Sequence, residues 1–110
     1  AVAKDGTIYV ADRFHHCIYA IKDDCIITFG GPKSGWMDGP LETALFHAPR
    51  TLHMDNYNNL WVLDDDGEGK LRRIHFGIPY NIVNTFKNIK CCGTFTVDKE
   101  GNLYVHDQEC

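Results

Sequence analysis

The sequence predicts an all-β protein built from stacked, four-stranded antiparallel sheets, arranged like the blades of a propeller. The first observation is a phrase that occurs three times: a turn, a hydrophobic residue, an aromatic residue, valine, one further residue and aspartate. The three copies end at Asp12, Asp64 and Asp107. Self-similarity of this kind indicates an array of one supersecondary unit.

The spacing of the copies is the second observation. Asp12 and Asp64 are 52 residues apart, Asp64 and Asp107 are 43 apart, and the excess lies in a stretch between Phe29 and Pro49 that contains glycine and proline. Repeats of about 40 to 50 residues are typical of propeller blades.

The third observation is that both faces of the repeated strand are apolar. Side chains alternate along a strand, so Ile8 and Val10 point one way and Tyr9 the other, and the later copies alternate similarly. A sheet with one wet face would carry polar residues at every second position, whereas a blade between two others buries both sides. The pattern therefore favours stacked blades over an open meander.

The strands can be assigned in order from hydrophobic runs bounded by turn residues such as those at 55–58 and 98–101. We expect the end of one blade, a linker segment, a complete blade and the start of the next, at 1–34, 35–49, 50–86 and 87–110. The expected strands before the last blade are the phrase ending at Asp12, then 16–21, 25–29, 50–55, 59–64, 70–76 and 81–86.

Two stretches resemble the NHL-repeat family of β-propellers, and the resemblance covers nearly the whole chain. The linker GWMDGPLETALFHAP at 35–49 is similar to the family's G-x-x-D-G-x-x-x-x-A-x-F-x-x-P segment, which precedes the innermost strand. Residues 12–21, DRFHHCIYAI, resemble its D-x-x-N-H-x-I-x-x-I signature, with His15 in place of asparagine. Residues 64–74 are a looser copy. The resemblance implies NHL-type blades of four antiparallel strands.

Chain length limits how much of a propeller these residues can form. NHL-like propellers close with about six blades, which needs roughly 250 residues at these repeat lengths, and the chain has 110. We therefore expect an incomplete propeller of about two and a half blades. The remaining blades would come from the same protein or from neighbouring subunits, and in one alternative several copies of the chain close a ring together.

The composition is that of a soluble globular domain, with 44% hydrophobic, 12% aromatic and 24% charged residues. No apolar run approaches the roughly 20 residues that span a bilayer, so no membrane span is expected. The net charge of −4 argues against a nucleic-acid partner, for which a basic face would be expected.

Five cysteines in this length suggest an oxidising compartment, and hence an extracellular or cell-surface location. None shows the C-x-x-C spacing of a zinc or redox site. An odd count means that at least one cysteine is free or has a partner outside the chain; the alternative is that all are buried thiols. The disulfide candidates are Cys17, Cys25, Cys91, Cys92 and Cys110.

Two groups of residues are candidates for a metal site. Asp64, Asp66 and Glu68 fall at alternate positions, as carboxylates do in the first half of a calcium loop, but His75 stands where such a loop needs glutamate. His53 lies on an expected innermost strand and could bind zinc in a central channel. We expect no cofactor, with calcium or zinc as the alternatives.

No catalytic constellation is visible, since the chain has neither a G-x-S-x-G elbow nor a phosphate-binding loop. The expected function is a non-catalytic interaction or structural module that binds protein partners through propeller loops. Arg13, Phe14 and Trp36 are the candidate contact residues, because arginine and aromatic side chains dominate interface energetics. The resemblance leaves two alternatives: a metal-dependent propeller enzyme of the lyase or lactonase type, and a cytosolic protein- or RNA-binding NHL domain.

Overall fold

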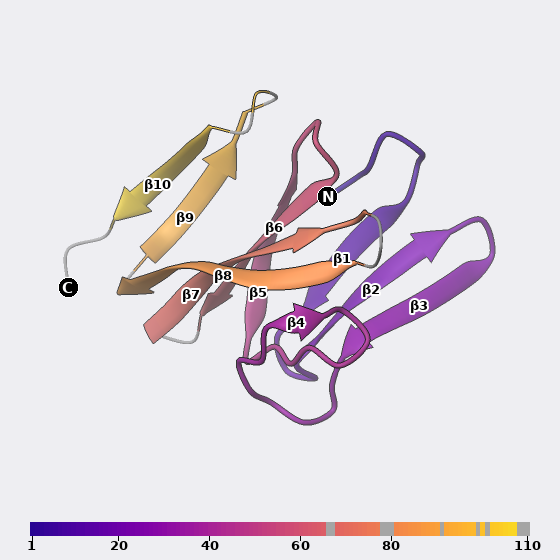
Figure 1. Ribbon diagram of the computed structural model, residues 1–110, viewed down its shortest axis with the longest axis horizontal. Helices are drawn as coiled ribbons and strands as arrows, with labels where there is room; N and C mark the ends of the chain where they lie inside the picture. The colour runs from indigo at the N-terminus through magenta and orange to yellow at the C-terminus, as the bar shows by residue number, and fades with distance from the viewer. Residues whose placement is uncertain (66–67, 78–80, 91, 99, 101, 108–110) are drawn as a thin grey trace.

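The computed structural model describes residues 1–65, 68–77, 81–90, 92–98, 100 and 102–107, and Figure 1 shows their arrangement. The described residues form ten strands and no helix, which confirms the predicted all-β class. The strands make three antiparallel sheets with the orders β1-β2-β3, β4-β8-β7-β6-β5 and β10-β9. The sheets lie side by side, with the five-stranded sheet between the other two (Figure 1). None of the described residues belongs to a helix that could cross a bilayer.

The first sheet holds β1 (Ile8–Asp12), β2 (Cys17–Lys22) and β3 (Cys25–Gly30). These strands begin and end within two residues of the ranges that the hydrophobic runs predict. A bridge between Val2 and Ile8 places the first residues of the chain beside β1. The sheet therefore has the beginnings of a fourth strand on that edge.

The central sheet contains β5 (Pro49–Met54), β6 (Asn59–Asp65), β7 (Glu68–His75) and β8 (Ile82–Lys90). Each strand pairs with the next along the chain, which is the order of a blade built from successive hairpins. β8 continues four residues beyond the predicted end of the strand. The third sheet consists of β9 (Cys92–Val97) and β10 (Leu103–Asp107).

Sequence patterns did not predict β4 (Gly39–Pro40), a two-residue strand in the linker segment that pairs with β8. Asp38 fixes this edge, because its carboxylate accepts hydrogen bonds from the amide of Thr85 at 2.9 Å and from its hydroxyl at 3.0 Å. Gly39 follows with a φ of 118°, which side chains of L-residues rarely tolerate. The linker thereby adds a fifth strand to the outer edge of the central sheet.

Both faces of the central sheet are buried, as the alternating apolar pattern predicts. Leu60 and Val62 are fully buried on the face toward the first sheet, and Trp61 is 4% exposed on the face toward the third. Leu63 and Leu71 accompany Trp61 there. The sheets are therefore packed face to face, as the stacked blades of a propeller are.

The outer face of the first sheet, which we define by Ile8, Val10, Ile21 and Ile26, is by contrast exposed. Strand register places Ile8, Ile21 and Ile26 in one row across the three strands. Ile8 is 45% and Ile26 66% exposed. The corresponding row of the central sheet, formed by Leu60, Ile74 and Val83, is completely buried.

A buried ion-pair network attaches the linker to the central sheet. Arg72, on β7, is fully buried, and its guanidinium donates to Asp64 at 3.1 Å and to Asp38 at 2.9 Å. It also donates to the carbonyl oxygens of Met37 and Leu45. Breaking a buried pair by removing one partner is costly, because the other charge stays buried and uncompensated. Arg72 thus determines where the linker lies.

Candidate functional site

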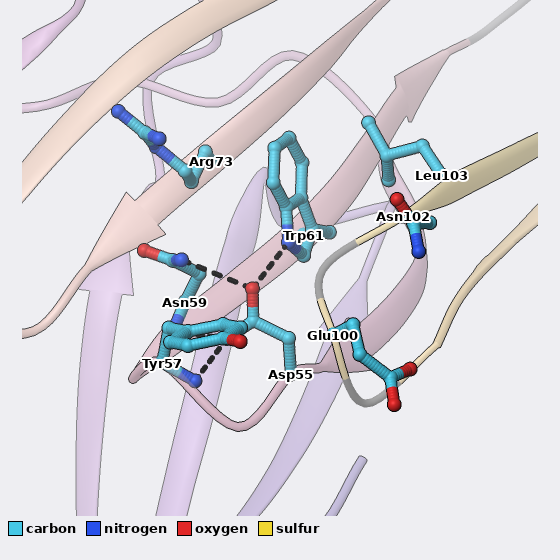
Figure 2. A pocket seen from close by; sticks show the side chains of 8 residues that line it. All are labelled: Asp55, Tyr57, Asn59, Trp61, Arg73, Glu100, Asn102 and Leu103. Carbon is cyan, nitrogen blue, oxygen red and sulfur yellow. Dashed lines mark hydrogen bonds between the residues drawn. The ribbon is translucent and has the colours of Figure 1, made fainter.

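The turn between β5 and β6 is organised by the carboxylate of Asp55. It accepts hydrogen bonds from the amides of Tyr57 and Asn59 at 2.7 and 3.0 Å, and from the Asn59 side chain and the Trp61 indole, both at 3.0 Å. Burial alone would raise the pKa of Asp55, but these hydrogen bonds to the ionised form outweigh it and lower the pKa. Figure 2 shows three of these bonds. Asp55 therefore fixes both the turn and the indole ring.

Aspartates that accept hydrogen bonds from turn residues recur at the equivalent turns of the other two sheets. Asp98 accepts from the amide and side chain of Asn102 and from the Tyr104 hydroxyl, at 2.8, 2.9 and 3.2 Å. Asp5 accepts from the amide and hydroxyl of Thr7 at 3.0 and 2.7 Å. An aspartate at the start of each turn is thus a repeated device that presents the following residues at one end of every sheet.

Clefts open between neighbouring sheets at this end. The Trp61 cleft, between the central and third sheets, has a volume of about 470 Å³. The Tyr9 cleft, between the first and central sheets, has a volume of about 410 Å³ and is lined in part by Lys4, Asp5, Tyr9, Asn58 and Phe76. The Trp61 cleft is lined by Asp55, Tyr57, Asn59, Trp61, Arg73, Glu100, Asn102 and Leu103 (Figure 2).

The two clefts differ in the side chain that lies beside the aromatic ring. In the first sheet Ala20 is the cross-strand partner of Tyr9, whereas in the central sheet Arg73 is the partner of Trp61. The Arg73 guanidinium carbon lies 5.9 Å from the centroid of the Trp61 ring, within the range of a cation–π interaction. The Trp61 cleft therefore carries a fixed positive charge that the alanine in the first sheet does not supply.

The remaining walls of the Trp61 cleft combine aromatic and polar groups. Tyr57 is 58% exposed at the turn between β5 and β6, and Glu100 and Asn102 lie across from it on the turn that leads into β10 (Figure 2). An aromatic surface with a few fixed polar groups can bind a ligand and orient it. Among the described residues that line the cleft, none is a nucleophile paired with a neighbouring base.

The predicted contact residues Arg13, Phe14 and Trp36 lie at the opposite end of the sheets. Arg13 and Phe14 are in the turn between β1 and β2, since successive turns of an antiparallel sheet alternate between its ends. Phe14 is 82% exposed. Trp36 contacts the ring of His47, with centroids 4.5 Å apart, and the Lys70 ammonium lies 5.3 Å from the Trp36 centroid. None of the three predicted residues reaches either cleft.

The predicted metal residues do not converge where they are described. Asp64 is fully buried and accepts hydrogen bonds from the amide of His47 as well as from Arg72. His53 is half-buried and is the cross-strand partner of Trp61. His53 and Trp61 therefore share one face of the sheet, and Asp64 lies on the opposite face. Asp66 and the side chain of Glu68 lie outside the described residues. Within the described part of the chain, no three His, Cys, Asp or Glu side chains are grouped to hold a metal ion.

The predicted disulfides gain no support from the structure. Cys17 and Cys25 are free thiols, the first buried and the second exposed. Cys17 begins β2 and Cys25 begins the antiparallel β3, so they lie at opposite ends of one hairpin, about 16 Å apart along the strand. The other candidate side chains lie outside the described residues: Cys91, Cys92 and Cys110.

A comparison with curated proteins connects these blades to a known repeat. The chain is 34% identical over 110 residues to NHL repeat-containing protein 2 of Gallus gallus, across 97% of this chain and 14% of that protein. The chain is made of NHL repeats. No family model and no solved structure matches it. Because the chain spans about a seventh of the relative, the similarity concerns the repeats and not the whole protein.

The NHL segments now have defined structural roles. The linker at 35–49 runs along the outer edge of the central blade through β4 and then buries Phe46 between the first and central blades. The signature stretch 12–21 forms the turn after β1 and most of β2. In the central blade, the aspartate of the repeat, Asp64, binds the linker backbone. The motif thus serves packing between NHL blades, while the clefts are lined by residues outside the 12–21 and 35–49 stretches.

Sequence reasoning missed the residues that make the Trp61 cleft distinctive, namely Tyr57, Arg73 and Glu100. A signal was present for Arg73, because aligning the repeated strands places it at the position of Ala20 in the preceding unit. No comparable signal identified Glu100, which enters the cleft only because the third sheet packs on the central one.

Proposed function

We propose that this NHL array is a non-catalytic interaction module that recognises a protein partner at the Trp61 cleft. The observation that carries the proposal is the exposed Tyr57 ring beside Trp61 and Arg73 in one concave site. Tyr, Trp and Arg are the residues most enriched at the energetic centres of protein interfaces.

The residues beneath the cleft hold it in a fixed shape, which suits binding of a partner. Asp55 holds the turn with hydrogen bonds to backbone and side chains, and the central sheet beneath it is buried on both faces. A rigid sheet that presents variable turns loses little conformational entropy when a partner binds. We therefore expect the partner to bind at this end of the sheets.

Photo-crosslinking tests the proposal. A benzophenone amino acid is placed at position 57 or at position 14 of the full-length protein, which is then irradiated in cells. Crosslinked partners are identified by mass spectrometry and tested as purified proteins. We expect a partner that crosslinks through position 57 and loses at least about tenfold in affinity on Tyr57→Ala. A partner that crosslinks through position 14 alone would contradict the choice of the Trp61 cleft.

The opposite end of the sheets is the second candidate surface. Phe14 is almost fully exposed, and the Arg13 guanidinium carbon lies 5.7 Å from its ring centroid. An exposed aromatic ring beside an arginine is of the composition found at the energetic centres of interfaces, which supports the sequence-based proposal that Arg13, Phe14 and Trp36 contact a partner. Crosslinking through position 14 is the outcome that this alternative predicts.

The extracellular location and the possible binding of calcium or zinc are proposals that rest on the sequence. The extracellular location depends on the cysteine count, and the free thiols of Cys17 and Cys25 do not add to it. Mass measurement of the purified full-length protein without reductant would distinguish disulfides from thiols. Metal analysis of the same material addresses the enzyme alternative, for which we would expect stoichiometric zinc or calcium.

A further inference from the structure

The Trp61 cleft differs chemically from the repeat-related Tyr9 cleft, and this difference indicates a ligand class. From the pairing of Arg73 with Trp61, we infer that the cleft binds a carboxylate on an acidic segment of a protein partner. The inference rests on the proposed function and specifies what the partner presents. Three observations on the residues around Arg73 carry it.

The first observation is that Arg73 is held in place without being neutralised by a described partner. Its side chain is half-buried and lies over the Trp61 ring, and its Nε is buried without a hydrogen-bond partner. Water is the usual partner of a surface guanidinium, and a charged acceptor that replaces it in a partly desolvated site forms a stronger hydrogen bond. Arg73 is thus positioned to bind a negatively charged group.

The second observation is that the buried carboxylate lining the same cleft, Asp55, already accepts hydrogen bonds from other groups. Both oxygens of Asp55 accept hydrogen bonds, from Tyr57 and Asn59 on one side and from Asn59 and Trp61 on the other. The same hydrogen bonds stabilise the ionised form of Asp55. They lower its pKa even though burial alone would raise it. Asp55 therefore orients the indole and is not the counterion that Arg73 lacks.

The third observation is the internal comparison that the repeat provides. Tyr9 and Ala20 occupy the positions of Trp61 and Arg73, and the first sheet folds with the smaller pair. Neither the sheet register nor the packing of the blade requires an arginine at this point. The cation is consequently an addition at one cleft, and its chemistry is that of carboxylate recognition.

An acidic peptide fits the shape of the site better than a small anion does. The cleft lies between Tyr57 and Asn59 on one wall and Glu100 and Asn102 on the other (Figure 2). Tyr57 offers an exposed ring beside the guanidinium for the aliphatic part of a neighbouring peptide residue. Glu100, on the other wall, would repel a ligand with many negative charges, so one or two carboxylates are expected.

A titration followed by NMR spectroscopy tests the inference on the 110-residue chain. The probe is an acetylated and amidated six-residue peptide with two central glutamates, compared with a matched peptide that carries glutamines. The readout is the indole N–H signal of Trp61, assigned with a Trp36→Phe variant. We expect the glutamate peptide to shift this signal and to bind at least about tenfold more tightly than the glutamine peptide.

Two substitutions locate the effect. Arg73→Ala introduces the side chain found at the equivalent position of the first sheet and should reduce the glutamate peptide's affinity to that of the glutamine peptide. Lys4→Ala removes a cation from the Tyr9 cleft and should leave the Trp61 shift unchanged. Retained dispersion of the backbone amide signals of the central sheet shows that the Arg73→Ala protein is folded; if it is not, Arg73→Gln serves in its place.

Several outcomes would overturn the inference. Equal binding of the two peptides, full binding by the folded Arg73→Ala protein, or a preference for a peptide with two lysines would each contradict carboxylate recognition. The proposed function fails differently, through absence of a partner that crosslinks at position 57. Crosslinking at that position, unaffected by Arg73→Ala and by the glutamate peptide, would retain the interaction site and reject its acidic ligand.

Discussion

At the scale of single residues, the carboxylate of Asp55 is the most heavily used group at the candidate site. It accepts hydrogen bonds from two backbone amides, an amide side chain and an indole N–H. Buried donors without acceptors are costly, so the geometry of the cleft depends on this one side chain. The repeated aspartates at positions 5 and 98 provide natural comparisons.

Asp55→Ala should lower the free energy of unfolding by about 2 to 4 kcal/mol, because it leaves buried donors unpaired. Urea denaturation at neutral pH measures the loss. Asp98→Ala is the matched control and should cost less, since Asp98 and its partners are more exposed. A smaller effect of Asp55→Ala than of Asp98→Ala would contradict the role given to Asp55.

The same substitution has an expected pH dependence. The pKa of Asp55 in the folded protein lies below its ordinary value of 3.8, so its contribution is complete above that value. It is lost as the pH falls from about 4 through the folded-state pKa. The stability difference between the unmodified and Asp55→Ala proteins should therefore shrink as the pH is lowered from 5 to 2. A difference that stays constant over this range would be inconsistent with an ionised acceptor.

Part of this residue-scale picture could be predicted from sequence. Aspartate, asparagine and glycine at 55–58 and 98–101 identify tight turns, because short polar side chains bond to nearby backbone amides. The bond from Trp61 to Asp55 could not be predicted, because it depends on the alternation that turns the indole toward the same face as the turn aspartate. Arg73 was overlooked because charged residues on strands are ordinarily solvated.

At the scale of elements, the linker is joined to the central sheet mainly through Arg72. The first sheet has Tyr19 at this position of the repeat, and its hydroxyl donates to Asp12 at 3.0 Å, as Arg72 donates to Asp64. Arginine reaches further than tyrosine and also bonds to the linker. At the same position of the repeat, Tyr19 therefore bonds to the strand aspartate of its blade, whereas Arg72 bonds both to the aspartate and to the linker.

Removal of this arginine should detach the linker before it unfolds the sheets. We expect Arg72→Ala to destabilise the protein by about 3 to 5 kcal/mol, because Asp64 would remain buried without its partner. Hydrogen exchange should accelerate at the amides of Met37 and Leu45 more than at those of β1 and β2. Lys22→Ala, which removes an exposed pair with Asp5, is the control and should cost less than about 1 kcal/mol. Equal losses would contradict the anchoring role.

Sequence patterns located nearly all of the elements but misjudged the linker. The strands that carry alternating apolar residues were found because burial on both faces leaves a clear pattern. β4 was missed because two residues, one of them proline, carry no periodic signal. The burial of Arg72 was unexpected for a related reason: arginine is rarely buried, and its partners come from a segment about 35 residues earlier.

At the scale of the whole molecule, the stack of sheets ends on an apolar surface. The outer face of the first sheet repeats the residue types that are buried in the central sheet, yet Ile8, Val10 and Ile26 are exposed. Patches of this kind mark surfaces at which proteins associate. We propose that further blades or a neighbouring subunit cover this face.

The chain by itself should therefore associate as its concentration rises. Sedimentation velocity is expected to show a growing fraction of dimers and larger species, and the double substitution Ile8→Lys and Ile26→Lys should shift the population toward monomers. Circular dichroism should show unchanged strand content, since both side chains are on the surface. A protein that is monomeric at every concentration before substitution would contradict the proposal.

The positions of Ala20 and Arg73 have a consequence for how such proteins diversify. Each of the two intervals between the described sheets holds a groove beside a turn aspartate, and the side chain at one strand position contributes to its charge. A single codon change can thus give one groove a new preference while the rest of the scaffold keeps its sequence and its fold. Gene duplication of blades would multiply the sites on which selection acts, so ligand preference can evolve groove by groove.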